Sequence, residues 1–484
     1  MNKLDEKFDH KDAWITLTIL SSLALIAMYG ETMLIPAIPI LVNNFKIPYN
    51  TSSWILTAYL IAGAVMTPIV GKLSDIHGKK KILIIVMFIY SIGTFFGGIS
   101  QNIYMMIFSR IIQGIGLSMF PVAFVIIREK FPAEKLAIGQ GIFTAVFAGG
   151  AIVGLGLGST IIEYFSWHMT FLSIVPLLII LLIVVIKLIH IKSEKLIKNP
   201  ENVIDIKGTI TLIILVTSFL VALTLLPNYV SKHKDINLLI ITISFILTIV
   251  LLPVFIIFQK NTEMPLINLQ LLKDAILLPT NILIMTIGMS IFIIYQSIPI
   301  MIQSPSPLGF GDGPVGAARI QLPFMITSFI ISILSGFFIS KIGNIKPTII
   351  GCIINVIGFF LLYINHSTEL TITIELAIIA VGLSFAEIGA FNISLVYTPI
   401  HLSGTALGIT MLLFLIGMSL GPTISGIYME SFKLISTGTV ESFPSDFAYE
   451  MIFLTATIIS LFSVLLTIII TKKINPTTSA RSIS

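Results

Sequence analysis

Charged residues are scarce in this sequence. Only 11% of its 484 residues are Asp, Glu, Lys or Arg, whereas an ordinary soluble domain has about 25%. Hydrophobic residues make up 56%, and apolar runs of roughly 20 residues, long enough to cross a bilayer, recur along the whole chain. Water is therefore excluded as the main solvent of the folded chain, and a lipid bilayer is its expected partner.

Several catalytic and structural signals are also missing. Cys352 is the single cysteine, which excludes an internal disulfide and a CxxC metal or redox pair. No GxxxxGK followed by Ser or Thr is present, so this chain does not hydrolyse ATP, and no HExxH motif indicates a metalloenzyme. The net charge of +5 lies in short loops instead of one basic face. The sequence thus predicts no metal, no cofactor, no enzymatic activity and no nucleic-acid partner.

Apolar runs between charged or turn-forming residues predict fourteen membrane spans and an all-α polytopic protein. The mixed-charge segment 1–13 precedes a first run that is too long for a signal peptide and lacks a small-residue cleavage site, so we expect an uncleaved span. The predicted spans are 14–35, 51–71, 82–99, 103–127, 137–162, 169–191, 207–227, 236–258, 277–302, 318–340, 347–364, 372–398, 403–429 and 447–471.

An internal repeat indicates how the spans are grouped. Two sets of residues recur in the second half of the chain at nearly constant spacing, namely Gly71, Gly78 and Lys81 as Gly336, Gly343 and Lys346, and Gly141, Gly150 and Gly154 as Gly408, Gly417 and Gly421. The alternative is chance, since glycine is common in membrane helices. The repeat predicts a 6+2+6 arrangement, in which two six-helix halves form an alternating-access transporter with its site where the halves meet. The predicted parts are a cytoplasmic N-terminus (1–13), a first half (14–191), a cytoplasmic linker (192–206), an inserted pair of spans with its following loop (207–276), a second half (277–471) and a cytoplasmic tail (472–484).

The loop after the second predicted span reads GKLSDIHGKKK, from Gly71 to Lys81. It resembles the loop signature of the major facilitator superfamily, in which Gly, Asp and Gly at this spacing precede a basic cluster; Lys79 stands where Arg is usual. Gly71 would allow close helix packing, and Asp75 could pair with basic groups or helix N-termini of the other half, so that Gly71, Asp75, Gly78 and Lys79 would form an inner gate. A solvated loop that only sets topology is the alternative.

Further segments resemble the fourteen-span drug and proton antiporter branch of that superfamily. They are SSWILTAYLIAGAVMTPIVGKLSD, SRIIQGIG, NTEMPLINLQLL, GETMLIPAIPIL and AGGAIVGLGLGS. The last resembles the branch's antiporter signature, although Leu155 replaces the expected Pro and the Gly-Pro step occurs instead at Gly421 and Pro422. Antiport and symport therefore both stay open. The spacing of Gly150, Gly154 and Gly158, like that of Gly417 and Gly421, is also a general device for helix packing.

Ionisable residues at membrane depth are candidate functional residues because their burial is costly. Glu31 is expected about 25 Å from the inner face and Arg110 about 10 Å below the outer face, so the two should face one cavity in which Arg110 holds the carboxylate ionised. Gln113 is one turn from Arg110 and is a candidate polar neighbour. A permanent ion pair that only joins spans one and four is the alternative reading.

A second candidate carboxyl is Glu387, about 22 Å from the outer face and without a basic residue at comparable depth. Burial favours the neutral form of such a group, which makes Glu387 a candidate proton carrier. The alternative is a neutral glutamic acid hydrogen-bonded to a neighbouring helix. Tyr59, Tyr295 and Asn392 are weaker candidates for a pocket lining, since such residues also serve as packing elements.

These observations predict a major facilitator fold that exports hydrophobic, cationic compounds in exchange for protons, with Glu31 and Glu387 as proton-coupling residues. The alternative within transport is an organic anion or metabolite anchored by Arg110. A membrane-embedded enzyme or sensor without transport is the rival from another class, and it would give no substrate flux in proteoliposomes.

Both termini are predicted to be cytoplasmic because nearly all Lys and Arg residues then lie in inner segments. The exceptions are Arg110 inside a span and, in outer loops, Lys46, Lys232, Lys234, Arg319 and Lys433. A cysteine placed at Ser482 should react with an impermeant thiol reagent only after cells are permeabilised. Labelling from outside intact cells would show that the topology is inverted.

Overall fold

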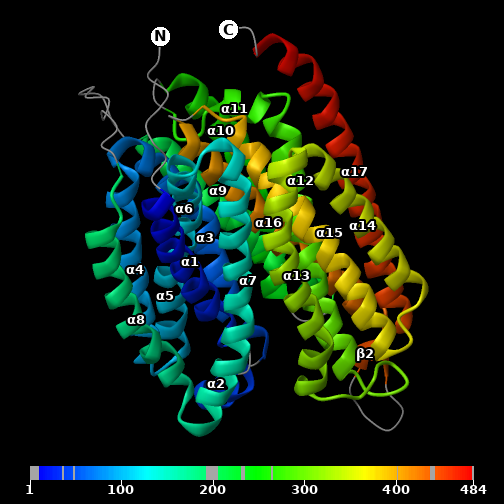
Figure 1. Ribbon diagram of the computed structural model, residues 1–484. Helices are drawn as coiled ribbons and strands as arrows, with labels where there is room; N and C mark the ends of the chain where they lie inside the picture. The colour runs from blue at the N-terminus through cyan, green and yellow to red at the C-terminus, as the bar shows by residue number, and fades with distance from the viewer. Residues whose placement is uncertain are drawn as a thin grey trace, which may run out of the picture. The chain divides into compact units, whose positions relative to one another are not determined.

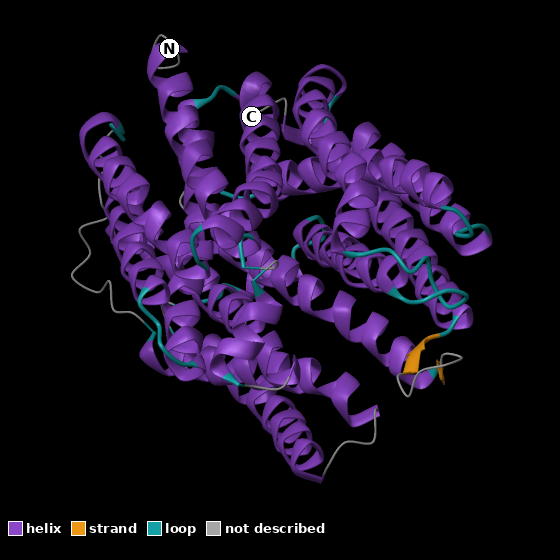
Figure 2. Ribbon diagram, turned by 90° about the horizontal axis from the view of Figure 1, so that it is seen from below, coloured by secondary structure: helices purple, strands orange, loops and turns teal. Residues whose placement is uncertain are grey.

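The computed structural model describes residues 10–34, 37–46, 49–191, 205–230, 235–262, 265–399, 402–435 and 442–481. Most of the predicted N-terminal segment 1–13 and of the linker 192–206, and the last residues of the tail 472–484, lie outside these ranges. The described chain is almost entirely helical (Figures 1 and 2), with one short antiparallel hairpin of β1 (Lys433–Ile435) and β2 (Ser442–Pro444).

Fourteen helical stretches of the described chain are long and apolar enough to cross a membrane, and they correspond one for one to the fourteen predicted spans. They are α1 (His10–Thr32), α3 (Tyr49–His77), α4 (Lys79–Gly98), the series α5 (Ile103–Gly114), η1 (Ile115–Ser118) and α6 (Met119–Lys130), α7 (Ala133–Tyr164), α8 (Trp167–Leu188), α9 (Ile206–Val230), α10 (Asp235–Asn261), α12 (Leu277–Gln303), α13 (Pro314–Ile342), α14 (Ile345–Ile364), α15 (Glu369–Val396), α16 (Ser403–Ser431) and α17 (Asp446–Arg481).

The structure also contains elements that the apolar pattern did not predict. Two short helices, α2 (Ile38–Phe45) and α11 (Leu269–Lys273), lie between spans. The predicted fourth span is divided by the 3-10 turn η1, next to Gly114 and Gly116. A Cβ at Gly114 would overlap the carbonyl oxygen of Tyr59, and one at Gly116 would overlap the ring of Tyr90. Close packing thus requires glycine here, and glycine weakens a regular helix.

The predicted loop between spans two and three is shorter than the sequence pattern indicates. Helix α3 continues through Asp75 to His77, and α4 begins at Lys79. The single residue between them, Gly78, has a φ of 92°, which L side chains rarely adopt. The helix break therefore depends on this glycine.

The chain divides into two compact units. The first comprises residues 1–202, 332–343 and 399–408, and the second comprises 203–331, 344–398 and 409–484. The first unit thus includes the end of α13 and the beginning of α16, although most of both helices belongs to the second unit. The division after residue 202 falls inside the predicted linker 192–206.

Glycines form close helix contacts in each unit. In the first unit, Gly150, Gly154 and Gly158 of α7 lie against α1, and a Cβ at Gly150 would overlap the carbonyl oxygen of Leu25. In the second unit, Gly417 and Gly421 of α16 lie against α12, where the obstructing atoms are the carbonyl oxygens of Met285 and Met289. Pro422 follows inside α16. The two units therefore use repeat-related glycines to bring backbones together.

Candidate functional site

A fully buried arginine joins three helices of the first unit. Arg110 of α5 donates from Nε to the carbonyl oxygen of Ile55 (3.0 Å) and from Nη1 to the carbonyl oxygen of Gly30 (3.0 Å) and to Oε1 of Gln113 (2.5 Å). The guanidinium carbon lies 4.7 Å from the ring centroid of Tyr59, a cation–π distance. Arg110 thus joins α5 to α1 and α3 through backbone acceptors, and its Nη2 has no hydrogen-bond partner among the described residues.

Helix α4 supplies two polar residues around this arginine that sequence reasoning missed. Gln113 donates from Nε2 to Oγ1 of Thr94 (3.1 Å), and the Tyr90 hydroxyl donates to the carbonyl oxygen of Ile26 (3.4 Å). Both α4 side chains are fully buried. Tyr90 and Thr94 are four residues apart and therefore lie on one face of the helix. Two polar residues at this spacing inside an apolar run are the feature by which the sequence indicates them.

Glu31 is the residue next to the Gly30 carbonyl that binds Arg110. It is 9% exposed, and its Oε2 is buried without a hydrogen-bond partner among the described residues. Glu31 and Arg110 interact electrostatically, but the described chain contains no ion pair within 4.0 Å between them. The arginine therefore joins the helices through carbonyl groups, and the carboxylate keeps a free acceptor.

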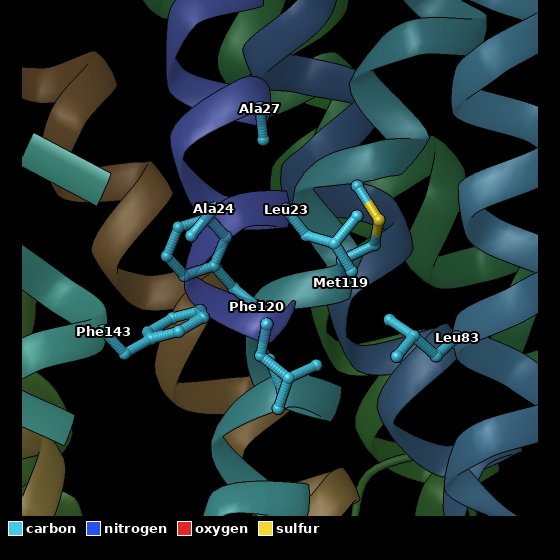
Figure 3. Close-up of a pocket in the computed structure, with 9 residues that line it drawn as sticks. Leu23, Ala24, Ala27, Leu83, Met119, Phe120 and Phe143 are labelled. Atoms are coloured by element: carbon cyan, nitrogen blue, oxygen red, sulfur yellow. The ribbon is translucent and has the colours of Figure 1, made fainter. Parts of the chain in front are cut away.

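A small apolar pocket lies against α1 (Figure 3). Ala24 and Ala27 contribute to its wall, and Glu31 follows Ala27 by one helical turn. The Tyr59 hydroxyl lies 3.5 Å from the carbonyl oxygen of Ala27, which links the pocket wall to the Arg110 group. The lining side chains are all apolar: Leu20, Leu23, Ala24, Ala27, Leu83, Met119, Phe120, Ala123 and Phe143.

The predicted gating residue Asp75 binds the N-terminus of α16. Its carboxylate accepts hydrogen bonds from the backbone N–H groups of Gly404 (3.0 Å) and Thr405 (2.8 Å) and from the Thr405 hydroxyl (3.0 Å). These are first-turn N–H groups without partners inside the helix, and the helix dipole favours an anion there. A Cβ at Gly71 would overlap the carbonyl oxygen of Gly404, so this approach requires glycine.

An ion pair and a hydrogen bond from an arginine lie near the contact at Asp75. Lys79, at the first position of α4, pairs with Glu129 of α6. The neighbouring Arg128 donates to the hydroxyl of Ser403 (2.7 Å), the first residue of α16. Three elements of the first unit, α3, α4 and α6, therefore contribute charged side chains to the group that holds the start of α16.

The first unit contains a second close glycine contact, which the internal repeat relates to the contact of Gly71 with α16. Gly71 of α3 would bring a Cβ 3.4 Å from Cα of Gly408 in α16, and Gly141 of α7 would bring one 3.2 Å from Cα of Gly336 in α13. Gly71 corresponds to Gly336, and Gly141 to Gly408, so each copy contributes one partner to each contact. The second contact lacks the carboxylate, because Ser340 replaces Asp75 and donates to the carbonyl oxygen of Phe337 in its own helix.

The remaining predicted residues lie in the second unit. Glu387 of α15 is half-buried and has no hydrogen bond or ion pair with the described residues. Asn392 donates from Nδ2 to Oδ1 of Asn344 (2.6 Å), whereas Tyr295 makes edge contacts with aromatic rings of α12 and α13. No hydrogen bond joins Tyr295 or Asn392 to Glu387 within the described chain. The described residues also contain no group of three or more His, Cys, Asp or Glu that could hold a metal.

Comparison with known proteins identifies the family of this chain. Residues 20–422 match the Major Facilitator Superfamily. The chain belongs to this superfamily. It is accordingly a multi-pass membrane transporter and not an enzyme, with a small molecule as its substrate.

Two relatives from Bacillus subtilis (strain 168) carry drug-related names. The chain is 29% identical to "Multidrug resistance protein 3" over 78% of its own length and 72% of the relative, and 27% identical to "Multidrug transporter protein MdtP" over 76% and 66%. The aligned part is thus just under two thirds of MdtP. Among solved structures, the human organic anion transporter MFSD10 (TETRAN) matches with a TM-score of 0.68, covering 94% of this chain and 99% of that one, at 13% identity. This likeness shows the fold alone.

Replacement of Asp75 by Asn should slow turnover of this facilitator-family transporter by roughly tenfold or more while substrate binding is retained. An amide cannot keep all the charge-assisted bonds to α16, and each is worth about 1.5–3 kcal/mol. Asp274→Asn is the matched control, because among the described residues the carboxylate of Asp274 accepts hydrogen bonds only from the backbone N–H groups of Ile276 and Leu277, at the start of the helix that follows it. Equal transport by wild type and the Asp75 variant would show that the segment from Gly71 to Lys81 only sets the membrane topology.

Proposed function

We propose that this transporter exports hydrophobic cationic compounds in exchange for protons, by alternating access. The observation that carries the proposal is the free Oε2 of Glu31, one helical turn beyond a small apolar cavity of the first unit that would have to widen to admit a ligand. Apolar walls favour a hydrophobic body, and a partly desolvated carboxylate favours a positive group. The names of the two Bacillus relatives agree with drugs as substrates.

Arg110 forms no ion pair within 4.0 Å with the carboxylate of Glu31 in the described chain, so this carboxylate can bind a ligand. Its Nε and Nη1 are bonded to Ile55, Gly30 and Gln113, so the guanidinium stays in place when a ligand binds Glu31. A cation can therefore bind without moving the helices that Arg110 joins.

The alternating step would use the group around Asp75. With both termini in the cytoplasm, the contact between Asp75 and the start of α16 lies at the inner end of the helices and closes that side. When the Asp75 carboxylate leaves the N–H groups of Gly404 and Thr405, the inner side would open. The charged contact at Asp75 would then control opening, whereas Gly141 and Gly336 provide close packing alone.

Proton coupling is assigned to Glu31 and Glu387. A proton supplies about 2.3 kcal/mol per 100 mV and about 1.4 kcal/mol per pH unit. At 100 mV and one pH unit the sum is roughly 3.7 kcal/mol, enough for a substrate gradient of about 500-fold. Use of this energy requires that proton and substrate are never both fully bound, and a carboxyl without a fixed partner can alternate between them.

An organic anion is a second candidate substrate, because Nη2 of Arg110 is buried without a partner among the described residues. The two candidates require opposite signs of ligand charge at one site. Removal of the negative charge at Glu31 should therefore weaken binding of a cation and strengthen binding of an anion.

Glu31→Gln should weaken binding of tetraphenylphosphonium about 10- to 100-fold, because it removes a partly buried charge worth roughly 1–3 kcal/mol to a cation. Binding of the uncharged tetraphenylsilane should change less than about threefold. Isothermal titration in detergent measures both, with Glu134→Gln on the exposed side of α7 as the control. Stronger binding of an organic anion in the Glu31 variant, with cation binding unchanged, would favour the second candidate.

Glu387→Gln, which mimics the protonated form, should abolish proton-driven efflux while counterflow exchange of substrate is partly retained. Exchange needs no net proton transfer, whereas uphill efflux does. Vesicles under an imposed pH gradient measure both activities, and Glu369→Gln is the control, because Glu369 lies at the exposed start of the same helix and pairs with Arg319. Wild-type efflux in the Glu387 variant, in the Glu31 variant and in the double variant would remove both carboxyls from the mechanism.

A further inference from the structure

One face of α15 carries a polar, aromatic and again polar series. Ser384, Glu387, Phe391 and Ser394 follow each other at three- and four-residue spacing, which places them on one side of the helix. Ser384 donates from Oγ to the carbonyl oxygen of Ser328 in α13 (3.4 Å), so this face is turned toward neighbouring helices of the second unit. Glu387 is the only titratable member of the series.

Beyond Phe391, three hydroxyl and amide groups from three helices are bonded together. Ser394 Oγ lies 2.8 Å from Oγ1 of Thr410 in α16, and Thr410 donates to Oδ1 of Asn281 in α12 (2.8 Å). All three side chains are buried. They form a polar segment inside a membrane helix bundle, a position where polar groups are costly.

Two phenyl rings lie next to this segment, because Phe391 precedes Ser394 by one turn of α15 and Phe414 follows Thr410 by one turn of α16. Phe391 lies one turn beyond Glu387 and contacts Phe414 of α16 edge to face, with ring centroids 5.8 Å apart. Both rings are buried, at 5% and 7% exposure. Glu387 and Ser394 are seven residues apart, about 10 Å along the helix, and Phe391 is the member of the series between them.

The aromatic pair is closely bounded by α12. A Cβ at Gly288 would lie 2.6 Å from the carbonyl oxygen of Phe414 and 3.2 Å from an atom of its ring. Glycine therefore permits α12 to approach the backbone and ring of Phe414. This leaves little space for water beside the ring, and an apolar constriction that excludes water blocks proton transfer as well.

We propose that Phe391 and Phe414 form a hydrophobic plug between Glu387 and the Ser394–Thr410–Asn281 segment, and that this segment is the wettable route from Glu387 to the cytoplasm. The inference rests on the proposed role of Glu387 in proton coupling. When the two rings of the plug move apart, a water file connects Glu387 with the Ser394–Thr410–Asn281 segment. The Glu387 carboxyl then gives its proton to that file and becomes a carboxylate, with no other bond formed or broken. The orientation proposed above puts the Asn281 end of the route on the inner side.

The test is proton leak without substrate. In proteoliposomes with an imposed pH gradient and a trapped pH-sensitive dye, Phe391→Ala should raise the leak rate roughly tenfold over wild type, because water can enter the plug. Adding Glu387→Gln should return the rate to the wild-type value. Adding Thr410→Val, which keeps the side-chain shape and removes the hydroxyl, should slow the leak. Phe359→Ala is the matched control, since Phe359 is a fully buried ring of α14 in the same unit and outside the series.

Equal leak in the Phe391 and Phe359 variants would overturn the proposal, as would a leak that persists after Glu387→Gln. Phe414→Ala provides the same test from the other ring if the Phe391 variant does not insert. The two proposals fail differently. Wild-type proton-driven efflux in Glu387→Gln removes the coupling role, whereas lost efflux in that variant with no leak in Phe391→Ala or Phe414→Ala removes only the plug.

Discussion

Lipid offers no hydrogen bonds, and this constraint determines most of the structure. Backbone groups must be satisfied inside each span, which leaves helices as the spanning elements. Helices in lipid then gain stability from close packing and from interhelical polar contacts instead of from burial of apolar surface. The glycines that lie against neighbouring backbones in both units, such as Gly150 and Gly417, follow from this. So does Arg110, whose guanidinium is bonded to carbonyl oxygens of Gly30 and Ile55.

The same constraint gives meaning to the polar atoms that lack partners in the described chain. Most buried polar groups of the first unit are bonded, including Gln113 and Tyr90. Oε2 of Glu31 is an exception beside an apolar pocket, and Glu387 is unbonded in the second unit. Groups that are costly to bury and have no structural partner are the ones available for a ligand or a proton. The packing of the helices thus leaves these carboxyls free for the proposed exchange of a cation for protons.

Much of the fold could be predicted from the sequence, because span length and the repeat are properties of short segments. The fourteen spans are confirmed, and so is the superfamily that the GKLSDIHGKKK loop resembles. The sequence could not show that Asp75 binds Gly404 and Thr405, because that pairing depends on tertiary packing across more than three hundred residues. The backbone acceptors of Arg110 were equally hidden, since any residue can supply a carbonyl. Tyr90 and Thr94 carried a weak spacing signal that was overlooked.

The central claim is that a cation and a proton compete for the carboxyl groups of one transporter, and proton release on binding tests it most directly. Purified protein in weakly buffered detergent is mixed with tetraphenylphosphonium, and a pH indicator records the protons released. We expect release of about one proton per bound cation, and this number should decline as the pH is raised and the carboxyls are already ionised. Tetraphenylsilane should release none. Binding of the cation without proton release over the whole pH range would show that cation and proton do not compete for these carboxyls. Equal release by both compounds would show the same.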